Sequence, residues 1–145
     1  MRICLDTSVL NRPFDDQTQP RIALENHALR TILQLIEAKE VELVNSAAIA
    51  YENSRNSSQP RRQWVERCLQ LASQFQAINE GITQRAALLE GQGLGAIDAL
   101  HVACAEASGC DYFLTCDDRL VRRYAGPLKV VNPVSFVLEI TGEDE

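Results

Sequence analysis

The amino-acid sequence predicts an α/β sandwich with a mostly parallel central sheet. Short apolar runs, typical of strands buried on both faces, alternate along the chain with segments whose apolar residues recur at helical spacing. The chain has 145 residues, of which 46% are hydrophobic and 23% charged, so it is long enough to bury a substantial core. Strands that alternate with helices favour parallel pairing through helical crossovers. We therefore expect a single domain over residues 1–145.

The first half of the chain is expected to contain two strands and two helices. A short apolar run ends at Asp6, which indicates a buried strand that leads into a loop. From Pro20 the apolar residues recur three, four and seven positions apart, and proline is favoured in the first turn of a helix. Ser46 is a suitable N-cap for the second helix. The expected elements are a strand at 3–5, a polar loop at 11–17, a helix from 20 to about 38, a strand at 41–45 and a helix at 47–52.

The second half is expected to alternate in the same way after a polar loop at 53–59. Pro60 opens a helix whose apolar face runs from Trp64 to Phe75, and glycines after residue 90 interrupt the next helix. Gly109 suits the C-terminal end of a later helix. The remaining expected elements are helices at 60–75, 82–89 and 96–107, a strand at 112–114, a short helix ending at 124, a strand at 130–131 and a helix at 134–140.

Charge and composition restrict the classes of partner. The formal net charge of −6, from 20 acidic and 14 basic residues, argues at first sight against nucleic acid, because phosphate contacts come from Lys and Arg. No apolar run approaches the roughly 20 residues of a membrane helix, and Asp6 comes too early for the apolar region of a signal peptide. We therefore expect a cytoplasmic protein with no membrane partner. The five cysteines form no C-x-x-C pair, which favours free thiols over a zinc site or a disulfide framework.

Four carboxylates stand where the predicted topology brings chain segments to one edge of the sheet. Asp6 and Asp117 follow predicted strands. Glu52 lies on the helix after the second strand, and Asp98 lies in the first turn of the helix that leads into the third. Ligands bind outside the carboxyl ends of parallel strands, and right-handed crossovers can deliver all these side chains there. Each acid alone also has a structural explanation, for example Asp117 as a helix cap.

The joint placement of these acids predicts a bound cation. Two carboxylates about 4 Å apart repel each other by about 4 kcal/mol at an effective dielectric of about 20, so several in one empty cleft would be costly. Ligand sets made only of oxygen suit Mg²⁺ or Mn²⁺, whereas zinc prefers His or Cys. Such metals bridge phosphate oxygens and stabilise in-line displacement. The residues therefore indicate metal-assisted phosphoryl chemistry and leave the substrate open.

Four segments, in order along nearly the whole chain, resemble the motif blocks of PIN-domain nucleases. They are Leu5–Leu10 (LDTSVL), Ser46 followed by Glu52, Ile97–Ala103 (IDALHVA) and Leu114–Asp117 (LTCD). Within that family, the sequence is similar to the small VapC-like toxins of type II toxin–antitoxin modules. It departs from the commonest pattern in the loop at 11–17, which is long and carries Asp15 and Asp16. Whether that loop affects substrate choice or covers the cleft is open.

The resemblance implies a metal-dependent endoribonuclease that hydrolyses RNA phosphodiester bonds with the help of Mg²⁺ or Mn²⁺. It implies a three-layer sandwich with about five parallel strands, frequent homodimerisation and an antitoxin protein as partner. The implied acidic cluster, both catalytic and metal-binding, consists of Asp6, Glu52, Asp98 and Asp117. Asp118 is an alternative for the last position, and the spacing from Thr115 favours Asp117.

Several polar residues have both a structural and a functional interpretation. Thr7, Ser8 and Thr115 are able to orient a carboxylate or water, although hydroxyls at strand ends commonly satisfy backbone groups. His101 lies one helical turn past Asp98, a position from which it could face the cleft, and the favoured expectation is a half-buried packing residue. Two groups of arginines suit either phosphate contacts or solvated helix faces. They are Arg55, Arg61, Arg62 and Arg67, and Arg119, Arg122 and Arg123.

Other functions fit the sequence less well. Gly91–Ala96 matches G-x-G-x-x-A but follows a predicted helix, which disfavours a dinucleotide site. A haloacid-dehalogenase-type phosphatase needs an Asp where Ser8 stands, and no Asp suits the phosphorylated position of a response-regulator receiver domain. A PIN-like domain that acts mainly as a protein-binding or regulatory module is the alternative. Without the four acids the net charge would be −2 rather than −6, so we expect RNA binding to depend on metal and on local arginines.

Overall fold

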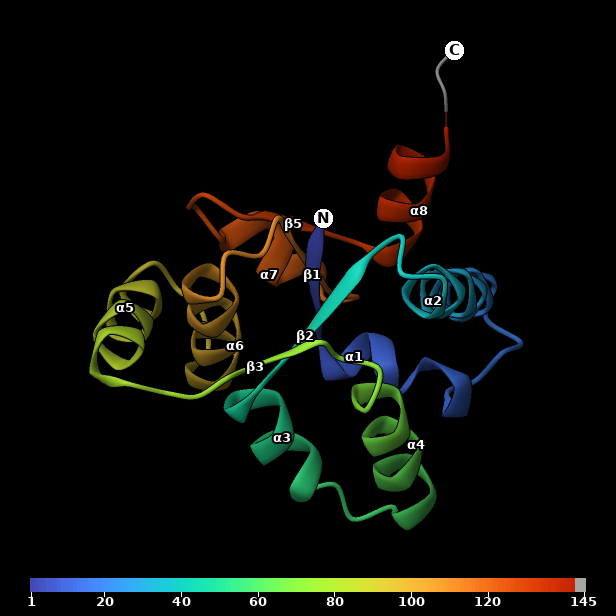
Figure 1. Ribbon diagram of the computed structural model, residues 1–145, viewed down its shortest axis with the longest axis horizontal. Helices are drawn as coiled ribbons and strands as arrows, with labels where there is room; N and C mark the ends of the chain where they lie inside the picture. Colours follow the sequence, from blue (N-terminus) through green and yellow to red (C-terminus); the bar gives the residue numbers. More distant parts are fainter. Residues whose placement is uncertain (143–145) are drawn as a thin grey trace.

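One parallel sheet forms the centre of the computed structural model, which describes residues 1–142 (Figure 1). Its strands are β1 Arg2–Leu5, β2 Glu42–Ser46, β3 Gln74–Gln76, β4 Tyr112–Leu114 and β5 Lys129–Val131. The strand order is β3-β2-β1-β4-β5, and every neighbouring pair is parallel. The predicted parallel α/β sheet is confirmed. The strand order reverses beside β1, and ligands bind at such switch points in α/β proteins.

Helices cover both faces of this sheet and complete the predicted three layers. The helices are α1 Thr7–Leu10, the 3-10 helix η1 Arg12–Phe14, α2 Pro20–Glu37, α3 Ala47–Ser54, α4 Gln59–Leu69, α5 Glu80–Gly91, α6 Ala96–Ala107, α7 Asp118–Arg123 and α8 Pro133–Thr141. One face packs against α2, α4 and α8, and the other against α6 and α7, with α5 packed on the outer side of α6 (Figure 1). Over residues 1–142, no helix combines the length and apolar character needed to cross a bilayer.

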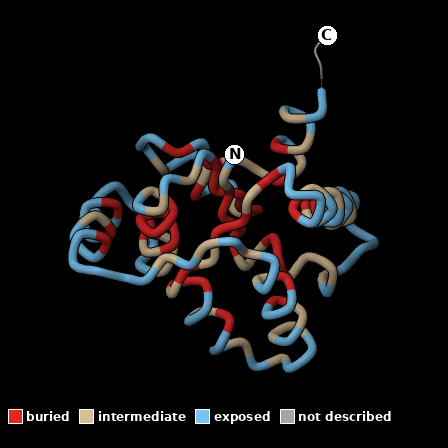
Figure 2. Tube along the Cα trace, in the orientation of Figure 1, coloured by how far each residue is buried: buried red, intermediate tan, exposed pale blue. Residues whose placement is uncertain are grey.

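The strands are buried on both faces because their side chains alternate between two cores. Ile3 and Leu5 of β1 pack on the side of α2 and α8, whereas Cys4 packs toward α6. Phe113 of β4 also lies on the α6 side, between neighbours that face the opposite layer. Figure 2 shows the buried residues concentrated in the sheet and on the inner sides of the helices. This two-sided burial explains why the strands are continuous apolar runs in the sequence.

The helix predicted for residues 60–75 is wrong at its C-terminal end. α4 ends at Leu69, and Phe75 lies in β3 with 59% of its surface exposed. The amide of Ser73 donates to the carbonyl of Leu43, where the pairing of β3 with β2 begins. β3 has three residues, too few to carry a periodic signal, so contact with β2 rather than local sequence determines it.

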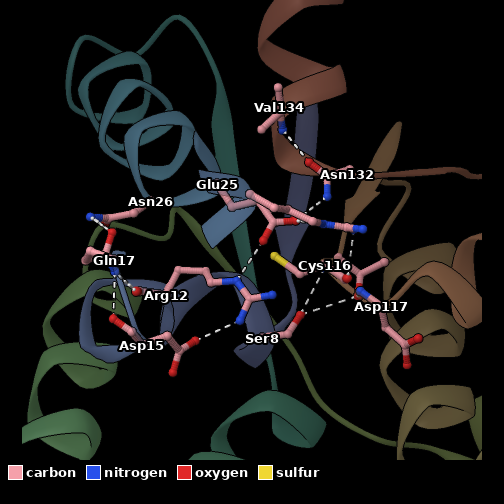
Figure 3. A network of polar contacts seen from close by, with 12 residues as sticks. Ser8, Arg12, Asp15, Gln17, Glu25, Asn26, Cys116, Asp117, Asn132 and Val134 are labelled. Carbon is pink, nitrogen blue, oxygen red and sulfur yellow. Dashed lines mark hydrogen bonds and ion pairs between the residues drawn. The ribbon is translucent and has the colours of Figure 1, made fainter. Parts of the chain in front are cut away.

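A buried ion-pair network holds the segment that follows β1, which was expected to be a loop and instead contains α1 and η1 (Figure 3). Glu25 of α2 is fully buried and accepts hydrogen bonds from Arg12 at 2.8 Å and Arg21 at 3.0 Å. A third comes from Asn132, in the turn before α8, at 2.5 Å. Burial alone would raise the pKa of Glu25, but these hydrogen bonds outweigh it and lower the pKa. The network therefore fixes η1 against two helices of one layer.

Candidate active site at the carboxyl edge of the sheet

The four predicted carboxylates are among the residues that line one open cleft of about 600 Å³ at the carboxyl ends of the strands. Asp6 directly follows β1 as the N-cap of α1, and Asp117 follows β4 as the N-cap of α7. Glu52 lies on α3, which follows β2, and Asp98 lies in the first turn of α6. The structure therefore brings together all the acids that the sequence predicted at this edge.

Asp6 is buried and held by two hydroxyl groups. Its Oδ2 atom accepts hydrogen bonds from Ser8 Oγ at 2.8 Å and from Thr115 Oγ1 at 2.7 Å. Ser8 Oγ in turn accepts from the amide of Cys116 at 3.1 Å (Figure 3), and Thr115 Oγ1 accepts from the amide of Asp117 at 3.1 Å. These hydroxyls orient Asp6, and Thr115 connects it to Asp117.

Glu52 is fixed by Thr7 and His101. Its Oε1 atom accepts a hydrogen bond from Thr7 Oγ1 at 2.8 Å and lies 2.6 Å from His101 Nε2. The Nδ1 atom of His101 is buried and has no hydrogen-bond partner among residues 1–142. A proton on Nδ1 would be an unsatisfied buried donor, so Nε2 is the ring atom that donates to Glu52. The hydrogen bond from His101 lowers the pKa of Glu52, against the opposing effect of burial.

The cleft disfavours the ionisation of Asp98. Burial and the charge of Asp6 raise its pKa to about 6, and Asp117 and Glu52 add to the rise while His101 opposes it. Like charges that raise a pKa in this way mark a cluster that a cation would neutralise. A cation near Asp98 would therefore favour its ionised form.

The donor set of the cleft fits Mg²⁺ or Mn²⁺. Ligand atoms of Asp6, Glu52 and His101 all lie within 4.8 Å of one another, but His101 Nε2 is engaged with Glu52. Among residues 1–142, nothing donates a hydrogen bond to Asp6 Oδ1 or Glu52 Oε2, because the bonds described above go to the other oxygen of each carboxylate. The atoms available to a cation are therefore oxygens, which suit these hard ions.

Asp117 and its neighbour Asp118 face different partners. Asp117 lines the cleft, and its Oδ1 atom accepts a hydrogen bond from the amide of Arg119 at 2.9 Å. Asp118 instead pairs with Arg21 through hydrogen bonds of 2.7 and 2.8 Å. The geometry thus favours Asp117 as the fourth acid of the cleft and gives Asp118 a structural partner.

The acids of the long first loop are already paired. Asp15 lies on the wall of the cleft and forms ion pairs with Arg12 at 2.8 Å and with Arg61 at 3.0 Å. Asp16 accepts hydrogen bonds from the amide and the hydroxyl of Thr18. The loop therefore covers one side of the cleft and brings a paired rather than a free carboxylate to it.

His101 is the residue that the sequence interpretation set aside. The expectation of a half-buried packing residue is wrong, since His101 is 1% exposed and contacts Glu52. The available signal was its spacing from Asp98, because residues three apart lie on the same side of a helix. The approach of α3, which brings Glu52 to that side of α6, has no signal in the local sequence.

The comparisons with known proteins agree with this architecture. A family model described as PIN domain matches residues 3–126. The chain is similar in structure to VapBC2 from Rickettsia felis, solved bound to a DNA fragment from their promoter, at 16% identity over 91% of this chain and 98% of that chain, with a TM-score of 0.61.

Two further solved structures are similar over most of their length. FitAcB from Neisseria gonorrhoeae is 18% identical over 90% of this chain and 97% of that chain, with a TM-score of 0.60. A toxin-antitoxin complex from Klebsiella pneumoniae is 21% identical over 90% and 97% of the two chains, with a TM-score of 0.57. No curated protein matches the chain. At these identities, the similarity establishes the fold.

Proposed function

Because the chain belongs to the PIN domain family, we propose that it is a Mg²⁺- or Mn²⁺-dependent endoribonuclease that hydrolyses RNA phosphodiester bonds. The observation that carries the proposal is the convergence of four acids on one cleft, together with the pKa of Asp98, which is raised to about 6. We assign Asp6, Glu52, Asp98 and Asp117 as the catalytic and metal-binding residues.

A divalent cation bound by these carboxylates would polarise phosphate oxygens and offset the charge that develops during hydrolysis. The residues of the chain supply the geometry. Ser8 and Thr115 hold one oxygen of Asp6, and Thr7 and His101 hold one oxygen of Glu52, so that the second oxygen of each stays available. Such supporting hydrogen bonds typically change metal affinity or activity by roughly 10–100-fold.

Local arginines support RNA as the substrate despite the net charge of −6. A cavity of about 320 Å³ shares Asp98 and Asp117 with the cleft and is lined by Arg119 and Arg123. Arginine matches the geometry of phosphate, and the cavity adjoins the acids proposed to act on the scissile bond. We therefore assign this cavity to a backbone phosphate of the bound strand.

We further propose that the protein is the toxin of a type II toxin–antitoxin pair, that it acts in the cytoplasm as a homodimer, and that an antitoxin blocks the cleft. The support is its structural similarity to VapBC2 and to a protein solved as a toxin-antitoxin complex. Expression of the chain alone should arrest bacterial growth, and co-expression of a small protein from the neighbouring reading frame should relieve the arrest. Growth arrest that persists in Asp98→Asn would contradict this assignment.

Cleavage of purified RNA tests the proposed activity directly. Structured and unstructured RNA should be cleaved with Mn²⁺ and remain intact with EDTA, and Asp98→Asn should abolish cleavage. Asp118→Asn is the matched control, because it makes the same change in charge at a residue paired with Arg21. Cleavage that survives EDTA or Asp98→Asn overturns the proposal. Absence of cleavage in a protein that still binds its antitoxin would favour the protein-binding alternative.

A further inference from the structure

A second cavity, of about 460 Å³, adjoins the acidic cleft on the side of α3. It shares four wall residues with the cleft, namely Thr7, Asn11, Glu52 and Asn56. We propose that this cavity binds a nucleobase of single-stranded RNA, next to the phosphate that lies at the carboxylates. The inference rests on the proposed function and adds to it the part of the substrate that this cavity recognises.

Tyr51 and Arg55 give the cavity a stacking surface. Tyr51 is 55% exposed although it is a large aromatic residue, and the Arg55 guanidinium lies 5.7 Å from the centre of its ring. Arg55 takes part in none of the salt bridges among residues 1–142. Proteins that bind single strands stack bases on exposed aromatic rings and on arginine planes. The pair is therefore suited to hold a base and to attract its phosphate.

Asn53 supplies an unsatisfied polar group in the wall of the same cavity. The residue is 4% exposed, its Nδ2 atom donates to the carbonyl of Arg62, and its Oδ1 atom has no partner among residues 1–142. A buried acceptor without a partner is costly, and a ligand with N–H donors, such as the edge of a nucleobase, is one way to satisfy it.

The position of the cavity favours a base over a peptide. An RNA strand whose phosphate lies at Asp6 and Glu52 would bring a neighbouring base to the adjoining cavity, since Thr7 and Glu52 belong to both walls. The lining combines an aromatic ring, a guanidinium and carboxamides, with Ile97 as its aliphatic contact. These groups match the face and the edge of a base.

Substitutions of Tyr51 test the inference through the kinetics of cleavage. With short single-stranded RNA and Mn²⁺, Tyr51→Ala should raise KM about tenfold with little change in kcat, because stacking acts on binding. Tyr51→Phe should restore KM, whereas Tyr51→Leu, which is apolar but not aromatic, should behave like Tyr51→Ala. Phe75→Ala is the matched control, since Phe75 is also an exposed aromatic residue, 59% exposed in β3. An unchanged KM in Tyr51→Ala overturns the inference, and a peptide-binding cavity would give that result.

Two further measurements separate this inference from the proposed function. With the wild-type protein, an RNA that has an abasic position beside the cleaved bond should have a KM about tenfold higher than the intact RNA. With Tyr51→Ala, the abasic position should cause no further rise in KM. If the abasic position and Tyr51→Ala raised KM additively, the base and Tyr51 would not be in contact. Fluorescence anisotropy of a labelled oligoribonucleotide with Asp98→Asn measures binding without cleavage. If the wild-type protein bound RNA in a way that depends on Tyr51 but did not cleave it, only the proposed function would be refuted. If it cleaved RNA at a rate and KM independent of Tyr51, only the base site would be refuted.

Discussion

The Nε2 atom of His101 lies 2.6 Å from the Oε1 atom of Glu52, although the two residues belong to different helices, α6 and α3. His101 is fully buried, so it holds Glu52 from the interior of the protein. The second oxygen of Glu52 receives no hydrogen bond from residues 1–142. His101 is therefore a positioning residue, which acts on the cleft through Glu52.

Replacement of His101 should lower activity through the loss of this positioning. We expect His101→Ala to reduce cleavage by roughly 10–100-fold and to raise the Mn²⁺ concentration needed for half-maximal rate. His101→Gln, which retains a donor, should recover part of the loss. Cys104→Ala, one turn further along α6 and also buried, should lower stability and leave the metal dependence unchanged. If all these variants needed a similar Mn²⁺ concentration for half-maximal rate, His101 would have only a packing role.

Asp98→Asn should stabilise the metal-free protein in a manner that depends on pH. The pKa of Asp98 is raised from 3.8 to about 6, so its ionised form opposes folding. This penalty is absent below the ordinary pKa, grows as the pH rises toward 6 and is complete above it. After allowance for solvent screening, Asp98→Asn should be more stable by about 1–2 kcal/mol at pH 7 and nearly equal to wild type at pH 4. Denaturant unfolding in EDTA measures both values, and equal differences at the two pH values would refute the explanation.

Mg²⁺ should stabilise the wild type through the same carboxylates. A ligand at about 100 times its Kd adds about 2.7 kcal/mol to the free energy of unfolding, which corresponds to roughly 5–10 °C in Tm for a chain of this size. Asp6→Asn and Asp98→Asn should lose most of this shift, and Asp118→Asn should retain it. Thermal melts with and without Mg²⁺ provide the comparison. Identical shifts in all four proteins would exclude a cation in the cleft.

Asp117→Asn and Asp118→Asn should differ in activity although they are neighbours. Asp117 lines the cleft, so its amide variant should lose cleavage activity. Asp118 pairs with Arg21 at the surface, so its variant should cleave RNA at close to the wild-type rate. Initial rates at saturating Mn²⁺ measure the difference. The reverse order would assign Asp118 to the site.

Glu25→Ala should destabilise the fold by about 3–5 kcal/mol, because it leaves Arg12 and Asn132 without their buried partner. The lowered pKa of Glu25 means that its ionised form stabilises the fold above the ordinary value of 4.5, and this stabilisation is lost as the pH falls through the lowered pKa. Wild type and Glu25→Gln should therefore approach each other in stability in acid. Glu37→Gln, exposed on the same helix, is the control. Urea unfolding from neutral pH into acid measures the difference in the free energy of unfolding between wild type and Glu25→Gln. A difference that stayed constant with pH would contradict the explanation.

Much of the fold and the acidic cluster could be predicted from local features of the sequence. The strands at Ile3–Leu5 and Tyr112–Leu114 are continuous apolar runs because both of their faces are buried. The position of these acids could be predicted as well, because a residue just after a strand reaches the carboxyl edge of the sheet wherever that strand lies. Asp6 and Asp117 were therefore predictable before the strand order was known.

The sequence by itself determined most of the strands and helices and which acids reach the edge of the sheet, because hydrophobic periodicity and strand ends are local properties. Tertiary structure alone decided the contacts between distant segments, including the pairing of β3 with β2 and the approach of His101 to Glu52. It also decided that Glu25 is buried, since Arg12 and Asn132 from two other segments join Arg21 of its own helix in satisfying its charge. Such contacts join residues far apart in the chain, and no local pattern encodes which of them meet.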